Sequence, residues 1–257
     1  MLKTACLLLI LASLAPAQTN VFANLPVAYE RNRGQADPAV EFLGRAGNYT
    51  VFLTASEAVF AARGAGVRMR LDGSQQSRPQ GVNMLPGISS YFTGDSDQWI
   101  TGIPQYGSVE YPNVYPGVNL VFHSQGGRVE YDFLLAPEAD PDRIRLVFEG
   151  ATNLGIDSSG DLVLETPAGQ MRHHAPVVTQ EMGGARRRVE AGFRLDSGGV
   201  VAFRIGAYDK RRALHIDPAV TFATYLGGND TDIGWWTGGD SLGNGYVAGG
   251  TLSLDFP

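Results

Sequence analysis

The chain has 257 residues, among them 26 acidic and 20 basic residues, 33 glycines and 14 prolines, and a net charge of −6. Hydrophobic residues make up 44% and charged residues 18%, which excludes a disordered chain, a coiled coil and a collagen-like polymer. The excess of acid also excludes a chain-wide basic surface, so nucleic acid is not an expected partner. The one basic run, Arg186 to Arg188, follows Gly183-Gly184 and is interpreted as a solvated turn.

Residues 1–17 have the pattern of a secretory signal peptide. Lys3 supplies the positive start, Ala5 to Ala15 the apolar run, and Ala15-Pro16-Ala17 a small-x-small cleavage site. The apolar run is too short to span a bilayer, and no later segment reaches ~18 uninterrupted apolar residues. We therefore expect a secreted or cell-surface protein with no membrane span in the mature chain. Its one cysteine, Cys6, lies within the signal.

Between Val40 and Ile216 apolar and polar residues alternate with the period of a half-buried strand. Turn residues such as Gly126-Gly127 and Gly183-Gly184 separate these runs at intervals of roughly ten residues, as in antiparallel folds. The alternation predicts strands within 67–71, 128–135, 143–148 and 188–195. The expected fold is all-β, with an N-terminal antiparallel β-sandwich-like domain over residues 18–217.

Within 128–135 the alternation predicts which side chains face the core. Val129, Tyr131 and Phe133 share the inner face, whereas Arg128, Glu130 and Asp132 share an outer, comparatively exposed one. Two carboxylates at this spacing are compatible with glycoside hydrolysis, but Arg128 beside them favours a solvated mixed-charge surface.

The passage from Gly73 to Pro116 contains five prolines and six aromatic residues, which predicts a long irregular loop. Three of its rings, Trp99, Tyr106 and Tyr111, are candidates for a ligand-stacking surface. The alternative, that the rings pin the loop to a sheet edge, is favoured because buried aromatic side chains mostly pack.

Other candidate sites are weak. His173 and His174 are adjacent and point to opposite faces of a strand, so they cannot chelate one metal together. His215-Ile216-Asp217 has the spacing of a metal clip, but structural packing is the favoured interpretation. Asn229, Asp230 and Asp232 could bind calcium weakly, although a turn stabilised by their side chains is favoured. No catalytic residue, cofactor or metal is predicted.

After Pro218 the composition changes, because Ala219 to Pro257 contains no Lys, Arg, His or Glu. The segments Thr224 to Gly228, Gly243 to Gly249 and Asp255-Phe256-Pro257 resemble one copy of the bacterial SBBP repeat, a β-propeller repeat. Trp235-Trp236-Thr237 departs from the repeat, which usually has small and aliphatic residues there.

Blocks upstream resemble the uncharacterised domain that commonly precedes such repeats in exported bacterial proteins; they are Tyr29 to Gln35, Tyr115 to Leu120, Val129 to Phe133 and Leu214 to Pro218. The resemblance implies a single propeller blade over residues 218–257. One blade cannot close a ring, so we expect the chain to be a fragment of a longer propeller protein.

The first functional hypothesis is an exported, non-enzymatic protein that presents an interaction surface to a protein or glycan ligand at the cell surface. The alternative is an envelope carbohydrate-active hydrolase that uses Glu130, Asp132 or Asp140. A third possibility is a carbohydrate-binding module that stacks sugars on Trp99, Tyr106 and Tyr111.

Overall fold

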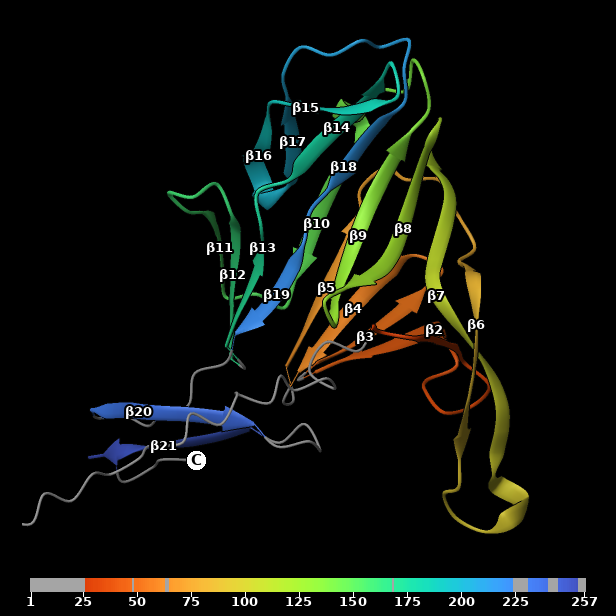
Figure 1. Cartoon of the computed structure of the whole chain (residues 1–257), viewed down its shortest axis with the longest axis vertical. Helices are drawn as coiled ribbons and strands as arrows, with labels where there is room; N and C mark the ends of the chain where they lie inside the picture. The colour runs from red at the N-terminus through yellow and green to blue at the C-terminus, as the bar shows by residue number, and fades with distance from the viewer. Residues whose placement is uncertain are drawn as a thin grey trace, which may run out of the picture.

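The computed structural model describes residues 26–47, 49–62, 65–167, 169–223, 231–239 and 245–253. The expected signal peptide lies outside these ranges and stays a prediction. Within them the chain is all-β, as predicted, and its strands form large antiparallel sheets (Figure 1). No helix in the described ranges is long and apolar enough to cross a bilayer.

The large sheet has fifteen strands in the order β15-β14-β18-β9-β8-β7-β1-β2-β3-β4-β5-β10-β17-β16, and β6 pairs with β7 beside this path. The bounds of its first eight strands are β1 Tyr29–Arg31, β2 Val40–Ala46, β3 Tyr49–Thr54, β4 Glu57–Ala62, β5 Ala65–Leu71, β6 Gln80–Tyr91, β7 Ile100–Tyr115 and β8 Val118–Gln125. The other seven are β9 Arg128–Leu135, β10 Arg145–Glu149, β14 Val177–Met182, β15 Ala185–Val189, β16 Ala191–Leu195, β17 Val201–Ile205 and β18 Leu214–Asp217.

A four-stranded sheet has the order β11-β12-β13-β19, and β20 pairs with β21 in a two-stranded sheet. Their bounds are β11 Asn153–Ile156, β12 Leu162–Thr166, β13 Gly169–His173, β19 Val220–Ala223, β20 Asp232–Gly239 and β21 Gly245–Thr251. Three short 3₁₀ helices span Ser96–Gln98 (η2), Pro141–Arg143 (η3) and Ser197–Gly199 (η4).

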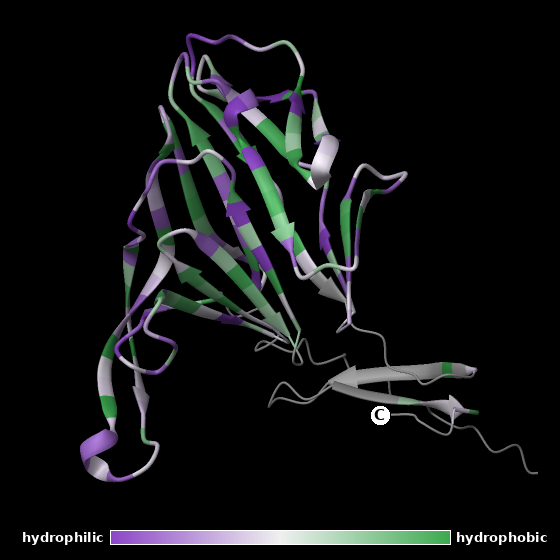
Figure 2. Ribbon diagram, turned by 180° about the vertical axis from the view of Figure 1, so that it is seen from behind, coloured by the Kyte–Doolittle hydropathy of each residue, from purple (hydrophilic) through white to green (hydrophobic). Residues whose placement is uncertain are grey.

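The two sheets share one hydrophobic core. Phe133 on β9 and Phe203 on β17 lie far apart in the strand order, yet their ring centroids are 5.8 Å apart because the large sheet curls around the core. His173 of the small sheet lies edge-on to the ring of Phe148, at a centroid distance of 5.0 Å, and fastens the small sheet to the large one. Figure 2 shows the alternation of hydrophobic and hydrophilic residues along these strands.

Strand β9 matches the predicted segment 128–135, and its inner face is confirmed. Val129, Tyr131 and Phe133 are each 0% exposed. The turn before β9 uses Gly126 and Gly127 with φ of 58° and 75°, which glycine adopts without strain and which suits a tight hairpin. On the outer face the prediction is wrong for Glu130, which is only 2% exposed because Ala219 bridges to it across the sheet.

The predicted strand 188–195 is in fact two strands. The chain leaves β15 at Val189 and begins β16 at Ala191, so Glu190 alone links the two end strands of the large sheet. The carbonyl of Glu190 accepts a hydrogen bond from the amide of Gly206. Alternation continues through Glu190, so the pattern gave no sign that the chain changes from one end of the curled sheet to the other.

The predicted irregular loop is also wrong. Residues 80–115 form the hairpin of β6 and β7, and its far end extends past the rest of the sheet (Figure 1). We call residues 84–105 of this hairpin the arm. Two prolines lie where the register shifts, Pro86 between Met84 and Ile88 and Pro112 between Tyr111 and Tyr115. Pro104 pairs with Ile88 at the end of the first of these shifts. Proline has no backbone N–H to donate, and the irregular part of the edge strand β6 around Pro86 does not require one.

Candidate functional site

Five ionisable side chains gather on the outer face of three neighbouring strands, β8, β9 and β18. Asp132 lies between two histidines, with its carboxylate oxygens 3.0 Å from Nε2 of His123 and 2.7 Å from Nε2 of His215. Glu130 lies directly opposite His123 in the β8–β9 ladder. Asp217 is two residues beyond His215 and therefore shares its face. We call these five residues the β9 cluster.

His123 and Asp132 influence each other's ionisation, and His215 acts on Asp132 as well. Partial burial opposes the charge on Asp132, but His123 and His215 outweigh it and lower the pKa of this carboxyl. Burial alone would depress the pKa of His123, whereas the neighbouring Asp132 and Glu130 raise it. The arrangement therefore favours a carboxylate between two imidazoles.

Glu130 and Asp217 behave in the opposite way. Burial and the charge of Asp217 raise the pKa of Glu130, and burial and the charge of Asp132 raise the pKa of Asp217. Glu130 is nearly inaccessible and its carboxyl makes no hydrogen bond or ion pair with any described residue. Two neighbouring carboxyls on one strand, Glu130 and Asp132, thus have pKa values that are moved apart.

Within the described part of the chain, no three His, Cys, Asp or Glu side chains are disposed to hold a metal ion. The residues of the calcium hypothesis give no test, since Asn229 and Asp230 lie outside the described residues and the side chain of Asp232 is not described.

The other predicted candidates have structural contacts. His173 is buried, and its Nδ1 lies 2.9 Å from the hydroxyl of Tyr131. His174 points the other way, to the carboxylate of Asp161 at 3.0 Å, as the alternation predicted. Asp140 accepts a hydrogen bond from the amide of Asp142 and so caps the short helix η3.

The three predicted stacking rings do not share one surface. Tyr111 is buried and its hydroxyl donates to the carbonyl of Thr54. Tyr106 is half-buried and packs edge-on against Phe42 at 5.8 Å. Trp99 is 47% exposed and lies at the end of the arm, so it is the one ring of the three that is open to a ligand. Ligand stacking itself stays a prediction.

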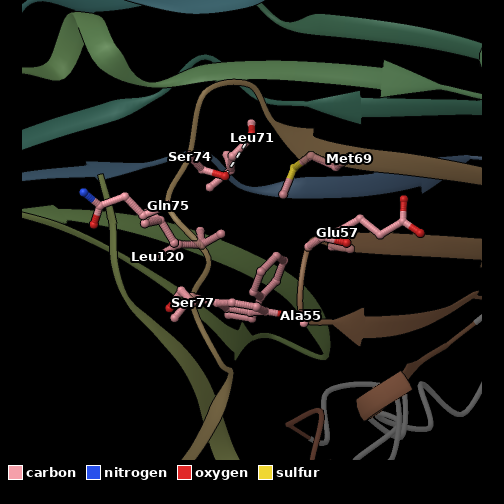
Figure 3. A pocket seen from close by; sticks show the side chains of 13 residues that line it. Ala55, Glu57, Met69, Leu71, Ser74, Gln75, Ser77 and Leu120 are labelled. Atoms are coloured by element: carbon pink, nitrogen blue, oxygen red, sulfur yellow. Dashed lines mark hydrogen bonds between the residues drawn. The ribbon is translucent and has the colours of Figure 1, made fainter. Parts of the chain in front are cut away.

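A cavity of about 30 Å³ lies beside Tyr111, between β4, β5 and the segment that leads into β6 (Figure 3). Met69, Leu71 and Leu120 line it, together with Ser77. That volume is about the share of one water molecule in the liquid, an order of magnitude below the ~300 Å³ of a small-molecule pocket. Its volume therefore matches a water-sized molecule and not a sugar or a larger substrate.

The arm exposes four large apolar side chains. The exposed fractions are 70% for Met84, 67% for Ile88, 66% for Phe92 and 47% for Trp99. The rings of Phe92 and Trp99 meet edge-on at 5.0 Å next to the short helix η2. No Lys or Arg occurs between Arg78 and Arg128, so the arm carries no basic residue. Exposed Met and aromatic side chains are typical of the core of a protein interface.

The arm is tied to the sheet by one buried carboxylate, Glu30 of β1. Ser89 donates to its Oε1 at 2.8 Å and Tyr91 to its Oε2 at 2.5 Å. Arg45 approaches Glu30 at 3.2 Å and lies over the ring of Tyr91 at 5.4 Å. Because three side chains converge on one carboxylate, the arm leaves the sheet in a fixed direction.

Comparison with protein-family models gives one match, to a family described as a domain of unknown function (DUF7948), over residues 29–219. No match to the SBBP repeat was found over the C-terminal segment, so that expected identity and its propeller blade stay predictions. No curated protein and no solved structure matches the chain.

Proposed function

Since the chain belongs to the DUF7948 family, whose description states no activity, we propose from its geometry that it is an exported, non-enzymatic interaction protein that presents the β6–β7 arm to a protein partner. One observation carries the proposal: four large apolar side chains stand exposed on a rigidly anchored hairpin. Hydrophobic residues (green) are visible along the arm in Figure 2.

One point favours a protein partner over a glycan. Met84 and Ile88 are aliphatic and lie along the strand away from the rings, where they offer nothing to a sugar but fit the apolar core of a protein interface. The acidic residues nearest the rings, Asp95 and Asp97, would still allow a glycan to bind at the tip alone, so a glycan is an outcome that the experiment must separate.

The proposal includes export and a longer architecture. The signal-like residues 1–17 support secretion or display at the cell surface, and the resemblance of residues 218–257 to a propeller repeat supports a longer propeller protein. In that arrangement the described β domain would be the N-terminal, β-sandwich-like part that carries the arm.

The test is site-specific photo-crosslinking in the cell that exports the protein. A photoreactive residue replaces Ile88 or Phe92 on the arm, and Asn153 on β11, which is also exposed, provides the control. We expect both arm positions, but not position 153, to yield the same cross-linked protein band. Equal labelling at all three positions, or a product that glycosidase removes, would contradict a protein partner at the arm.

A second candidate function is hydrolysis at the β9 cluster. The specific observation in its favour is the opposite displacement of the pKa values of Glu130 and Asp132, since an acid–base pair needs one protonated and one ionised carboxyl. The near-complete burial of Glu130 argues against it, because a catalytic acid must reach its substrate. Assay of the E130Q and D132N variants on a polysaccharide panel separates the two functions: activity lost on substitution would favour the hydrolase.

A further inference from the structure

We propose that the free edge of β15 is a second docking site, which binds an extended acidic peptide segment as an additional strand. β15 is the terminal strand of the large sheet and its described ladder partner is β14. Its residues Ala185 to Arg188 are all exposed. A partner strand would find unpaired backbone N–H and C=O groups there, as in other cases of β-strand addition.

The side chains of β15 specify the charge of the partner. Arg186, Arg187 and Arg188 are consecutive, and none forms an ion pair or side-chain hydrogen bond with a described residue. Arg186 lies opposite Glu181 in the ladder but makes no ion pair with it. The charge of Arg186 acts on Asp217, but no carboxylate lies within ion-pair distance of any of the three among the described residues. Arg186 and Arg188 share one face of the strand and repel each other, which an acidic partner would relieve.

Most other arginines of the chain do have a carboxylate partner. Arg68 pairs with Glu57, Arg70 with Glu149, and Arg172 with both Asp157 and Asp161. The chain has more acidic than basic residues, so the free arginines do not reflect a shortage of acid. Charged side chains also discourage accidental edge pairing, so the experiment must show specific binding and not only a protected edge.

The geometry of β15 suits an acidic strand with several carboxylates. Successive side chains alternate, so Arg186 and Arg188 lie on one face and Arg187 on the other. Consecutive Asp or Glu residues on an added strand would therefore meet an arginine on each face. Guanidinium groups bind carboxylates in a bidentate manner, which gives geometric specificity in addition to charge.

A hollow beside β15 offers a further contact. It has a volume of about 410 Å³ and is lined by Arg187, Arg188 and Tyr208, among others. The hydroxyl of Tyr208 is buried and has no hydrogen-bond partner among the residues that the structure describes. Asp209 also lines the hollow and the charges of Asp140 and Asp142 act on Tyr208, so the contact with an incoming carboxylate is assigned to Arg187 and Arg188. Single-stranded nucleic acid fits less well, because it needs several stacking platforms and Tyr208 is the aromatic residue that lines this hollow.

The test measures binding of the full chain to a fluorescent peptide that contains Glu-Glu-Glu flanked by Val and Thr, by fluorescence anisotropy. We expect R186Q/R187Q/R188Q to weaken binding at least about tenfold. The matched control R33Q/R78Q/R128Q removes three exposed arginines elsewhere and should stay within about twofold of the parent protein. A peptide with N-methylated alternate amides should also lose binding, since it cannot form a ladder.

Three results would overturn the proposal. They are equal loss in the control variant, unchanged affinity for the N-methylated peptide, and tighter binding of dextran sulfate, which would reassign the edge to an acidic glycan. If the glutamine variant aggregates through its uncharged edge, R187E keeps the edge charged and should still lose peptide binding. Unchanged affinity in a soluble R187E protein would likewise overturn the proposal.

Discussion

His173 shows how burial sets the protonation of a single residue. It is 0% exposed, and burial, followed by the charge of His174, lowers its pKa to about 3. A histidine in the unfolded chain has a pKa of about 6.5, so between pH 6.5 and 3 the unfolded state binds one more proton than the folded state. The free energy of unfolding must therefore decrease as the pH is lowered through this window, by about 1.4 kcal/mol per pH unit from this residue.

We predict that H173Q flattens this dependence. The amide cannot take up the proton, so the free energy of unfolding should fall less steeply between pH 6 and pH 4 than in the parent protein. At pH 7 the variant should be less stable by ~1 to 3 kcal/mol, because the packing against Phe148 is disturbed. Urea unfolding at the three pH values measures both effects. Identical pH slopes in the two proteins would show that His173 is protonated in the fold.

Glu130 illustrates the opposite case, a buried carboxyl with a raised pKa. The carboxyl of Glu130 ionises less readily in the folded state than in the unfolded state. This difference lowers the free energy of unfolding at neutral pH, and the effect vanishes below the pKa of the unfolded chain. We predict that E130Q is more stable than the parent protein at pH 7, by ~1 kcal/mol. The gain should disappear near pH 4, and calorimetry at the two pH values measures it.

If E130Q instead destabilises the protein at pH 7, the carboxylate has a partner that the structure does not describe. A gain in stability combined with a loss of hydrolytic activity would point to a functional carboxyl kept at a cost in stability. D132N is the comparison. Asp132 contacts two histidines, so the protein should lose stability when the charge of this residue is removed.

Among the strands, those with a local signal were predictable from sequence. β9 and the hairpin before it follow from alternation and from Gly126-Gly127, both of which lie within a short stretch of chain. The long arm was missed because prolines within 73–116 suggested irregularity, whereas the structure tolerates them at register shifts. A proline removes one backbone hydrogen-bond donor from a strand. An edge strand or a bulge can do without that donor, so proline does not exclude a strand.

The β9 cluster could be found only in part. The spacing of Glu130 and Asp132 pointed to a shared face, and that face exists. His215 and Asp217 join it because β18 pairs with β9, although about eighty residues separate them in the chain. Such long-range register leaves no local signal, so His215-Ile216-Asp217 was assigned to packing.

The predicted boundary at residues 217 and 218 can be tested at the level of one strand. β19 lies beyond it, pairs with β13 and places Val220 in the core with 0% exposure. We predict that a chain ending at Asp217 is less stable than one ending at Ala223 by ~2 to 3 kcal/mol, the cost of exposing Val220 and losing its ladder. Urea unfolding of the two truncated chains measures the difference.

Equal stability of the two chains would support the boundary at Asp217 as originally predicted. A large difference would instead assign β19 to the N-terminal folding unit and leave the repeat-like segment to begin after Ala223. The family match, which ends at residue 219, falls between these two limits.

In the molecule as a whole, the strands that form the core are distinct from the two surfaces that we propose as binding sites, the arm and the edge of β15. The curled sheet buries one continuous core that includes residues of the small sheet, so its strands are fixed by packing on the inner face. The arm and the edge of β15 contribute little to that core and are exposed. Exposed apolar or charged surfaces on a rigid scaffold are where binding is expected.

The most direct test of the proposed interaction function is binding of the purified mature chain to cells of the organism that encodes it. We predict that M84S/I88S/F92S/W99S loses at least about tenfold in binding while its melting temperature stays within about 2 °C of the parent protein, because these side chains are exposed. E130Q/D132N should bind like the parent protein. Retained binding by the arm variant together with lost binding by E130Q/D132N would contradict the account and place the function at the β9 cluster.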